Sequence, residues 1–161
     1  MALKNRLADF ALLAPPVQDA ETFHQTTPAF FREVPVCGPA FPFSSDQILT
    51  WEYLQFAPIS SLCHGISPHQ LYEDWFRQHG LTFSPDIETA TADQILPMVR
   101  ANLGIGFVPE HAAQKAAADG SVKILRLREK LPERTVILLK RKGSPFSIAA
   151  AALEQLLLKR C

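Results

Sequence analysis

The sequence lacks any run of apolar residues close to the roughly 20 that a membrane-spanning helix requires. It also lacks net charge, because 16 Lys and Arg residues balance 16 Asp and Glu residues. Without a basic surplus, the chain offers no global electrostatic attraction for nucleic acid or for an anionic membrane. The N-terminus does not show the basic, apolar and small-residue order of a signal peptide, so we expect a cytoplasmic protein without membrane contact.

Cysteine is scarce, and its three copies, Cys37, Cys63 and Cys161, are far apart and outside any C-x-x-C pattern. This spacing argues against a disulfide framework and against a zinc site. Four histidines show no metal-ligand spacing and no acid pair stands out; these histidines are His24, His69, His79 and His111. We therefore expect no cofactor and no metal.

The 161 residues are 47% hydrophobic, which is enough to bury a core in one domain or in two small lobes. Residues 82–110 organise the rest of the chain, because they predict a strand, a helix, a second strand and the start of another helix. Thr91 and Gln94 form a capping box, and Gly104 suits the left-handed residue that ends the helix. Pro97 lies inside this predicted helix and should kink its second turn. The pattern is a β-α-β unit.

The glycines of this unit do not form a dinucleotide-binding fingerprint. Gly104 and Gly106 follow a helix instead of opening one, and Pro109 stands where the third glycine should be. A Rossmann cofactor site is therefore not predicted.

The other elements alternate along the chain. The end of a helix is expected over 2–7, a polar loop over 17–27 and hinges over 38–45 and 129–133. Strands are expected over 9–14, 29–37, 57–63, 122–127 and 135–139, and the first of them is expected to be buried. Helices are expected over 46–54, from Ser67 to Gly80, over 109–119, ended by Gly120, and, capped by Ser147, over 148–158. Such alternation predicts a mostly parallel α/β arrangement.

Several stretches together resemble one known family. They are ALKNRLADFALLAPP, LTWEYLQFAPISSL, ADQILPMVRANLGIGFVPEHAAQ, SVKILRL and PERTVILLKRKGSPFSIAAAALEQLL. In this order they resemble the effector-binding domain of LysR-type transcriptional regulators, and the resemblance covers nearly the whole chain.

The resemblance implies an α/β, two-lobe, periplasmic-binding-protein-like (type 2) fold with Rossmann-like lobes and a small-molecule cleft between them. The first lobe, which is incomplete, would be residues 1–56 with 132–161, and the second lobe would be 57–131. The family's winged helix-turn-helix, linker helix and opening strand-helix-strand have no counterpart here. DNA contact is therefore expected only through a missing N-terminal domain, and a homo-oligomer only in the parent protein. A first lobe without its central strand predicts an exposed apolar edge, with poor solubility or self-association.

On this reading, several segments end at the cleft and supply the candidate ligand-binding residues Pro15, His64, Gly65, Ser67, Thr89, Thr91, Phe107 and Val108. Two of the segments open helices, whose N–H groups and positive dipole ends favour an anion. We expect an anionic metabolite, such as a carboxylate, at the hydroxyls of Ser67 and Thr91, with Phe107 and Val108 as the apolar wall.

Each candidate also has a purely structural interpretation. Ser67 and Thr91 could only cap their helices, and His64 could be an ordinary surface residue in a turn. Phe107 and Val108 could belong to the core, and Pro15 to a stiff turn.

Three functions remain in competition. The first is the regulatory module of a transcription factor, in which a ligand shifts the balance between two lobe arrangements. The second is a soluble solute-binding protein of the same fold that serves transport. In the third, an enzyme, Cys63 would be the nucleophile and His64 its base. Adjacent strand residues point to opposite faces, which disfavours this pair.

Overall fold

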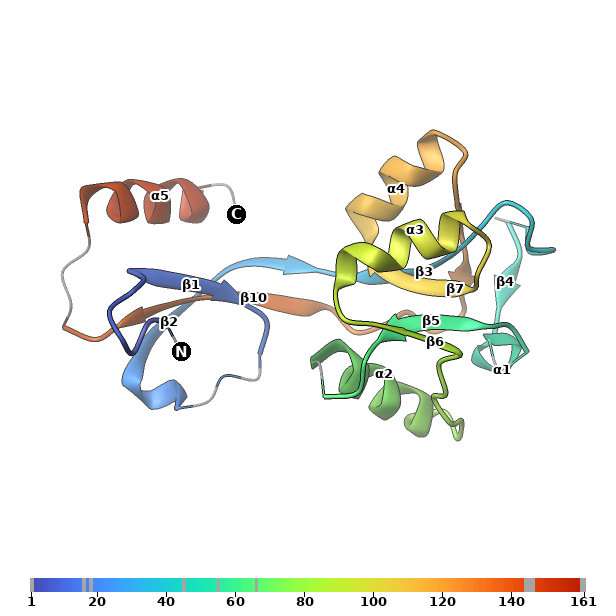
Figure 1. Cartoon of the computed structure of the whole chain (residues 1–161), viewed down its shortest axis with the longest axis horizontal. Helices are drawn as coiled ribbons and strands as arrows, with labels where there is room; N and C mark the ends of the chain where they lie inside the picture. Colours follow the sequence, from blue (N-terminus) through green and yellow to red (C-terminus); the bar gives the residue numbers. More distant parts are fainter. Residues whose placement is uncertain are drawn as a thin grey trace. The chain divides into compact units, whose positions relative to one another are not determined.

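The computed structural model describes residues 2–15, 17, 19–44, 46–54, 56–65, 67–143 and 147–159, with the backbone alone at residues 20 and 67. The chain divides into two compact units (Figure 1). Unit 1 comprises Met1–Phe31 and Glu133–Cys161, and unit 2 comprises Arg32–Pro132. None of the helices in the described ranges has the length and hydropathy that crossing a membrane requires.

Unit 1 is built on an antiparallel sheet in the order β1-β10-β2. Its strands are β1 (Phe10–Leu13), β2 (Phe23–Phe31) and β10 (Arg134–Arg141), with a short 3-10 turn η1 (Ala20–Thr22) and the helix α5 (Ile148–Lys159). Buried Leu3, Phe23, Ile137 and Leu139 form its small core. Ser147 caps α5 as expected, because its Oγ accepts a hydrogen bond from the backbone amide of Ala150 at 3.2 Å.

Two expectations for unit 1 are wrong. Residues 23–27 were expected in a polar loop, but they belong to β2 because they pair with β10, with Thr26 opposite Leu138. The first strand was expected to be buried, but Leu12 is exposed. The reason is that β1 is an edge strand of an antiparallel sheet, where alternate side chains face solvent. Residues 2–7 form turns that end at Arg6, whose φ is 58°.

Unit 2 contains a mixed sheet in the order β6-β5-β7-β3-β8. The strands are β3 (Glu33–Cys37), β5 (Ile59–Leu62), β6 (Ile87–Thr89), β7 (Ile105–Pro109) and β8 (Lys123–Ile124). Strand β5 runs parallel to both β6 and β7, whereas β3 runs antiparallel to β7 and β8. Within this sheet, the parallel arrangement expected from the sequence is therefore found at β5, β6 and β7.

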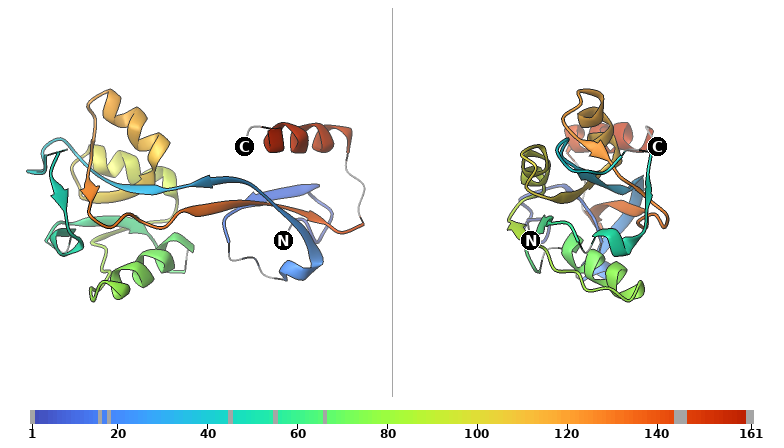
Figure 2. Two further views of the ribbon diagram at one scale, coloured as in Figure 1. Left: turned by 180° about the vertical axis from the view of Figure 1, so that it is seen from behind. Right: turned by 90° about the vertical axis from the view of Figure 1, so that its right-hand side faces the viewer.

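Helices cover both faces of the unit 2 sheet (Figure 2). One face carries α1 (Trp51–Leu54) and α2 (Ser67–Gln78), and the other carries α3 (Ile95–Arg100) and α4 (Glu110–Ala118). The first face is aromatic, because the Trp51 ring lies 5.2 Å from Phe76 and 6.4 Å from Phe107. The second face is packed with small and β-branched side chains of α3, α4 and the central strands.

The border of unit 2 differs from the expected lobe border at residues 56 and 57. Residues 32–56 lie in unit 2, because β3 is an inner strand of its sheet and Trp51 of α1 is buried among the aromatic rings of α2. The expected helix over 46–54 is a two-residue strand β4 (Ile48–Leu49) followed by the short α1. The expected strand over 122–127 is divided into β8 and β9 (Arg126–Leu127), because β8 pairs with β3 and β9 pairs with β4.

The β-α-β unit is present, but its helix differs from the prediction. It begins as a 3-10 turn, η2 (Ala92–Gln94), so Pro97 falls in the first turn of α3, where no intrahelical hydrogen bond is lost and no kink is needed. The left-handed residue near its end is Asn102, with φ of 60°, and not Gly104. Gly104 is required for another reason: a Cβ there would lie 2.7 Å from the carbonyl oxygen of Pro58.

Candidate functional site

The carboxyl ends of β5, β6 and β7 meet at one edge of the unit 2 sheet. Leu62 of β5 lies opposite Thr89 of β6, and Ser60 lies opposite Gly106 of β7. The backbone amide of Cys63 extends the ladder by donating to the carbonyl oxygen of Thr89 at 2.9 Å. Ligands of open α/β sheets bind at this type of edge. We call it the carboxyl edge.

The turn from β5 into α2 brings His64 and Gly65 to the carboxyl edge. Both residues are exposed, and Gly65 has φ of 85°, a conformation that glycine adopts without strain. Helix α2 begins at Ser67, as the sequence predicts. The Ser67 side chain lies outside the described residues, so its expected role in capping or ligand binding stays a prediction.

Thr89 and Thr91 lie at the end of β6 with different environments. Thr89 is buried, and its Oγ1 donates to the carbonyl oxygen of Thr91 at 2.9 Å. Thr91 is exposed and makes no side-chain capping bond, so the predicted capping box is wrong at this position. Its carbonyl oxygen instead accepts the backbone amide of Gln94 at 3.2 Å, as a 3-10 turn requires. The Thr91 hydroxyl is consequently not used to stabilise the turn.

Phe107 and Val108 are core residues. Phe107 is 5% exposed and its ring lies 4.7 Å from that of Tyr72, whereas Val108 packs among the residues of α3 and α4. Adjacent strand residues face opposite sides of the sheet, which explains why one strand supplies both faces. Pro15, which follows β1, lies in unit 1 and is exposed.

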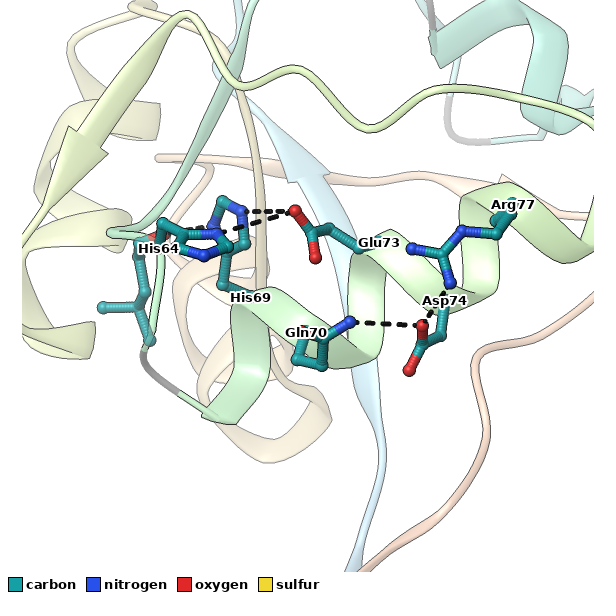
Figure 3. Close-up of polar contacts among 7 residues, drawn as sticks. His64, His69, Gln70, Glu73, Asp74 and Arg77 are labelled. Atoms are coloured by element: carbon teal, nitrogen blue, oxygen red, sulfur yellow. Dashed lines mark hydrogen bonds and ion pairs between the residues drawn. The ribbon is translucent and has the colours of Figure 1, made fainter.

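His64 belongs to a polar cluster that the sequence did not predict (Figure 3). Its Nδ1 lies 3.7 Å from Oε1 of Glu73, and Nε2 of His69 lies 3.3 Å from the same oxygen. Nδ1 of His69 donates to the carbonyl oxygen of Leu62 at 2.8 Å. His69 and Glu73 are four residues apart on α2, which places them on one helix face. That spacing was visible in the sequence, but the third member comes from the turn before the helix.

Unit 2 also contains a hollow of about 420 Å³. It is lined by Arg32, Glu33, Val34, Pro35, Ile48, Glu110, Ile124, Leu125, Arg126, Leu127, Lys130 and Leu131. Basic and acidic side chains both line it, so it has no single preferred ligand charge. None of the predicted site residues whose side chains the structure describes contributes to its lining.

Known structures share this fold. The regulatory domain of Synechocystis PCC6803 CcmR in complex with 2-PG superimposes with a TM-score of 0.84 and 14% identity, covering 99% of this chain and 76% of that chain. The effector binding domain of QuiR in complex with shikimate superimposes with a TM-score of 0.81 and 17% identity. The match covers 99% of this chain and 74% of the QuiR chain. The fold is therefore the α/β, two-lobe, periplasmic-binding-protein-like fold of LysR effector-binding domains.

Sequence similarity identifies the family. Residues 1–161 match the profile of the LysR substrate binding domain. The chain is 30% identical over 125 residues to an uncharacterized HTH-type transcriptional regulator of Bacillus subtilis, YusT, covering 78% of this chain and 40% of YusT. It is also 30% identical over 93 residues to the HTH-type transcriptional regulator SoxR of an Arthrobacter species. This match covers 58% of this chain and 32% of SoxR.

The chain therefore belongs to the LysR substrate binding domain family, as the resemblance implied. It spans less than half the length of the curated relatives that it matches.

Proposed function

We propose that this chain is the effector-sensing module of a LysR-type transcriptional regulator and that it binds a small anionic metabolite at the carboxyl edge of unit 2. The family match over residues 1–161 supports the regulatory role. The CcmR and QuiR domains, whose fold the chain shares, were solved with 2-PG and shikimate. These findings do not favour a transport protein, and the curated relatives are transcriptional regulators and not enzymes.

The observation that carries the choice of edge is the meeting of two segments that end in polar groups. The first turn of α2 follows β5 and presents backbone N–H groups that have no partner within the helix. Beside it, the exposed hydroxyl of Thr91 follows β6 and is not used in capping. Amides and a hydroxyl at the positive end of a helix favour a carboxylate or a similar anion.

The buried Phe107 and Val108 contribute to this proposal only by holding β7 in place. A ligand at the edge would contact the backbone of the strand ends and the exposed His64, Gly65 and Thr91. Ser67 remains a candidate contact.

Effector binding would act by favouring one arrangement of the two lobes. The ligand must then bind one arrangement more tightly, by about 1–3 kcal/mol for a typical coupling. In the parent regulator, the change in lobe arrangement would alter how DNA-binding domains are placed within a homo-oligomer. We propose the DNA-binding domain and the homo-oligomer for the parent protein only. A cytoplasmic location is part of the same proposal.

Nuclear magnetic resonance titration of the isotope-labelled chain with a panel of small carboxylates tests the site. We expect amide shifts at Gly65 and Thr91, and a loss of affinity in Thr91→Ala without a matching loss of stability. Ser147→Ala is the control, because it removes a capping hydroxyl in unit 1 and should leave affinity unchanged. Shifts confined to residues outside the carboxyl edge would contradict the proposed site.

A further inference from the structure

We propose that His64, His69 and Glu73 form a binding site for a divalent transition metal ion, with Zn²⁺ as the best-fitting probe. The three side chains offer one ligand atom each, and these atoms lie within 4.8 Å of one another. Two imidazole nitrogens and one carboxylate oxygen are a ligand set that zinc uses in proteins, with a fourth position left open. This inference goes beyond the proposed function, since metabolite binding at Thr91 does not require it.

The hydrogen bond of His69 to Leu62 determines which ring nitrogen is available. The Leu62 carbonyl can only accept, so the His69 Nδ1 at 2.8 Å carries the proton. In the neutral ring, Nε2 then presents its lone pair. Metal-binding histidines are commonly oriented by such a bond from the other ring nitrogen to a backbone carbonyl.

The lone pair of His69 Nε2 faces another acceptor. Oε1 of Glu73 is 3.3 Å away, and two acceptors at this distance need a cation or a proton between them. Ligand bonds of about 2.0–2.1 Å at tetrahedral angles place two ligand atoms roughly 3.3–3.4 Å apart. The separation between His69 and Glu73 therefore matches two ligands of a single ion.

His64 supplies the third ligand. Its Nδ1 lies 3.7 Å from the same carboxylate oxygen of Glu73. This distance exceeds the tetrahedral spacing by a few tenths of an ångström. The exposed His64 ring, in the turn before Gly65, can move by this amount.

The surroundings of the cluster suit a specific site. His69 is 4% exposed, and its ring packs edge-on against Phe83 at 5.2 Å, which fixes its position. The Glu73 side chain is 25% exposed and that of His64 is 75% exposed, so an ion could enter from solvent and keep a water or an anion as its fourth ligand.

Equilibrium dialysis of the whole chain against zinc chloride at neutral pH, with metal content measured by mass spectrometry, tests the site. Cys63→Ser serves as the background, so that the neighbouring thiol cannot bind the ion. We expect one zinc per chain, and a loss of affinity of about tenfold or more in both His64→Ala and Glu73→Gln. His64 is exposed and Glu73→Gln keeps the side-chain shape, so both variants should fold, as circular dichroism would verify.

Asp74→Asn is the matched control. Asp74 is the next carboxylate on α2, but its Oδ1 accepts hydrogen bonds from Gln70 at 3.2 Å and Arg77 at 2.9 Å and takes no part in the cluster (Figure 3). The Asp74→Asn variant should bind zinc with the same affinity as the Cys63→Ser background. Histidine side-chain nitrogen spectra should show a zinc-dependent shift at His69 Nε2. Absence of stoichiometric zinc, or equal affinity in the control and both site variants, would overturn the proposal, whatever the outcome of the carboxylate titration.

Discussion

The side-chain oxygen of Asn102 accepts a hydrogen bond from the backbone amide of Ala40, 2.9 Å away and 62 positions earlier in the sequence. Asn102 also holds φ of 60° just after α3. Asparagine is suited to both tasks, because its side chain bonds locally and tolerates the left-handed conformation. One residue therefore ends the helix segment and anchors the loop after β3.

Replacing Asn102 separates these two roles. Asn102→Ala loses the hydrogen bond and strains the backbone, so we expect a loss of about 1–3 kcal/mol in the free energy of unfolding. Asn102→Gly loses the same bond but adopts positive φ freely, and should lose less. Urea denaturation of both variants measures the difference. Equal losses would show that the backbone conformation contributes nothing.

Gly104 should not tolerate a side chain although its φ is not left-handed. A Cβ at this position would lie 2.7 Å from the backbone oxygen of Pro58, which cannot move without disturbing β5, so Gly104→Ala should cost about 1–3 kcal/mol. Gly80 is the opposite case: it has φ of 72°, and among the described residues other than its chain neighbours no atom would lie within 4 Å of a Cβ there. Gly80→Asn should therefore cost less than Gly104→Ala in thermal denaturation, because asparagine tolerates positive φ better than most side chains do. A larger loss there than at Gly104 would contradict this explanation.

The two predicted capping hydroxyls should differ in their effect on stability. Ser147→Ala removes a bond to the Ala150 amide and a bond to Asp9, and should lower the free energy of unfolding by about 1 kcal/mol. Thr91→Ala removes a hydroxyl that makes no capping bond, and should change it by no more than about 0.5 kcal/mol. Chemical denaturation of the two variants compares them. A larger loss at Thr91 would restore the capping interpretation.

Burial raises the pKa of the Cys37 thiol, and Lys123 opposes the shift only in part. A raised pKa in the folded state favours the neutral thiol. Its contribution to stability is therefore present below the ordinary pKa of a thiol and is lost as pH rises through the folded-state value. We expect the free energy of unfolding to fall less steeply with alkaline pH in Cys37→Ala than in the parent chain. Unchanged slopes would argue against the shift.

The same burial predicts slow alkylation of Cys37. In a Cys161→Ser chain, iodoacetamide at neutral pH should label the half-buried Cys63 before Cys37, and Cys37 only after denaturant is added. Peptide mass spectrometry identifies the labelled residue. Fast labelling of Cys37 in the folded chain would show that this part of the core opens readily.

Helix α5 exposes apolar side chains in unit 1, among them Ile148 at 92% and Leu156 at 60%. Exposed apolar patches promote association, so light scattering should show an apparent mass that rises with concentration. Leu156→Lys should reduce this rise. Phe56→Ser, which removes an exposed apolar ring in unit 2, is the control and should leave the rise unchanged. A chain that stays monomeric at all concentrations would contradict the prediction.

The sequence predicted those features that a few neighbouring residues determine. Gly80 and Gly120 end their helices with positive φ, and Ser147 caps α5, because these conformations depend on local sterics and hydrogen bonds. The order of strands and helices in residues 82–110 was also predicted, and the whole pattern was specific enough to identify the LysR family.

Features that depend on distant partners were decided only by the tertiary structure. Residues 23–27 form a strand because they pair with β10. Trp51 belongs to unit 2 because its ring packs against the rings of α2. After Thr91 the chain forms a 3-10 turn that the capping pattern did not predict. This turn determines the environment of Thr91 at the carboxyl edge. The cluster of His64, His69 and Glu73 likewise exists because a turn folds back onto α2. Local propensity acts within one helical turn, whereas pairing and packing are selected by the free energy of the whole core.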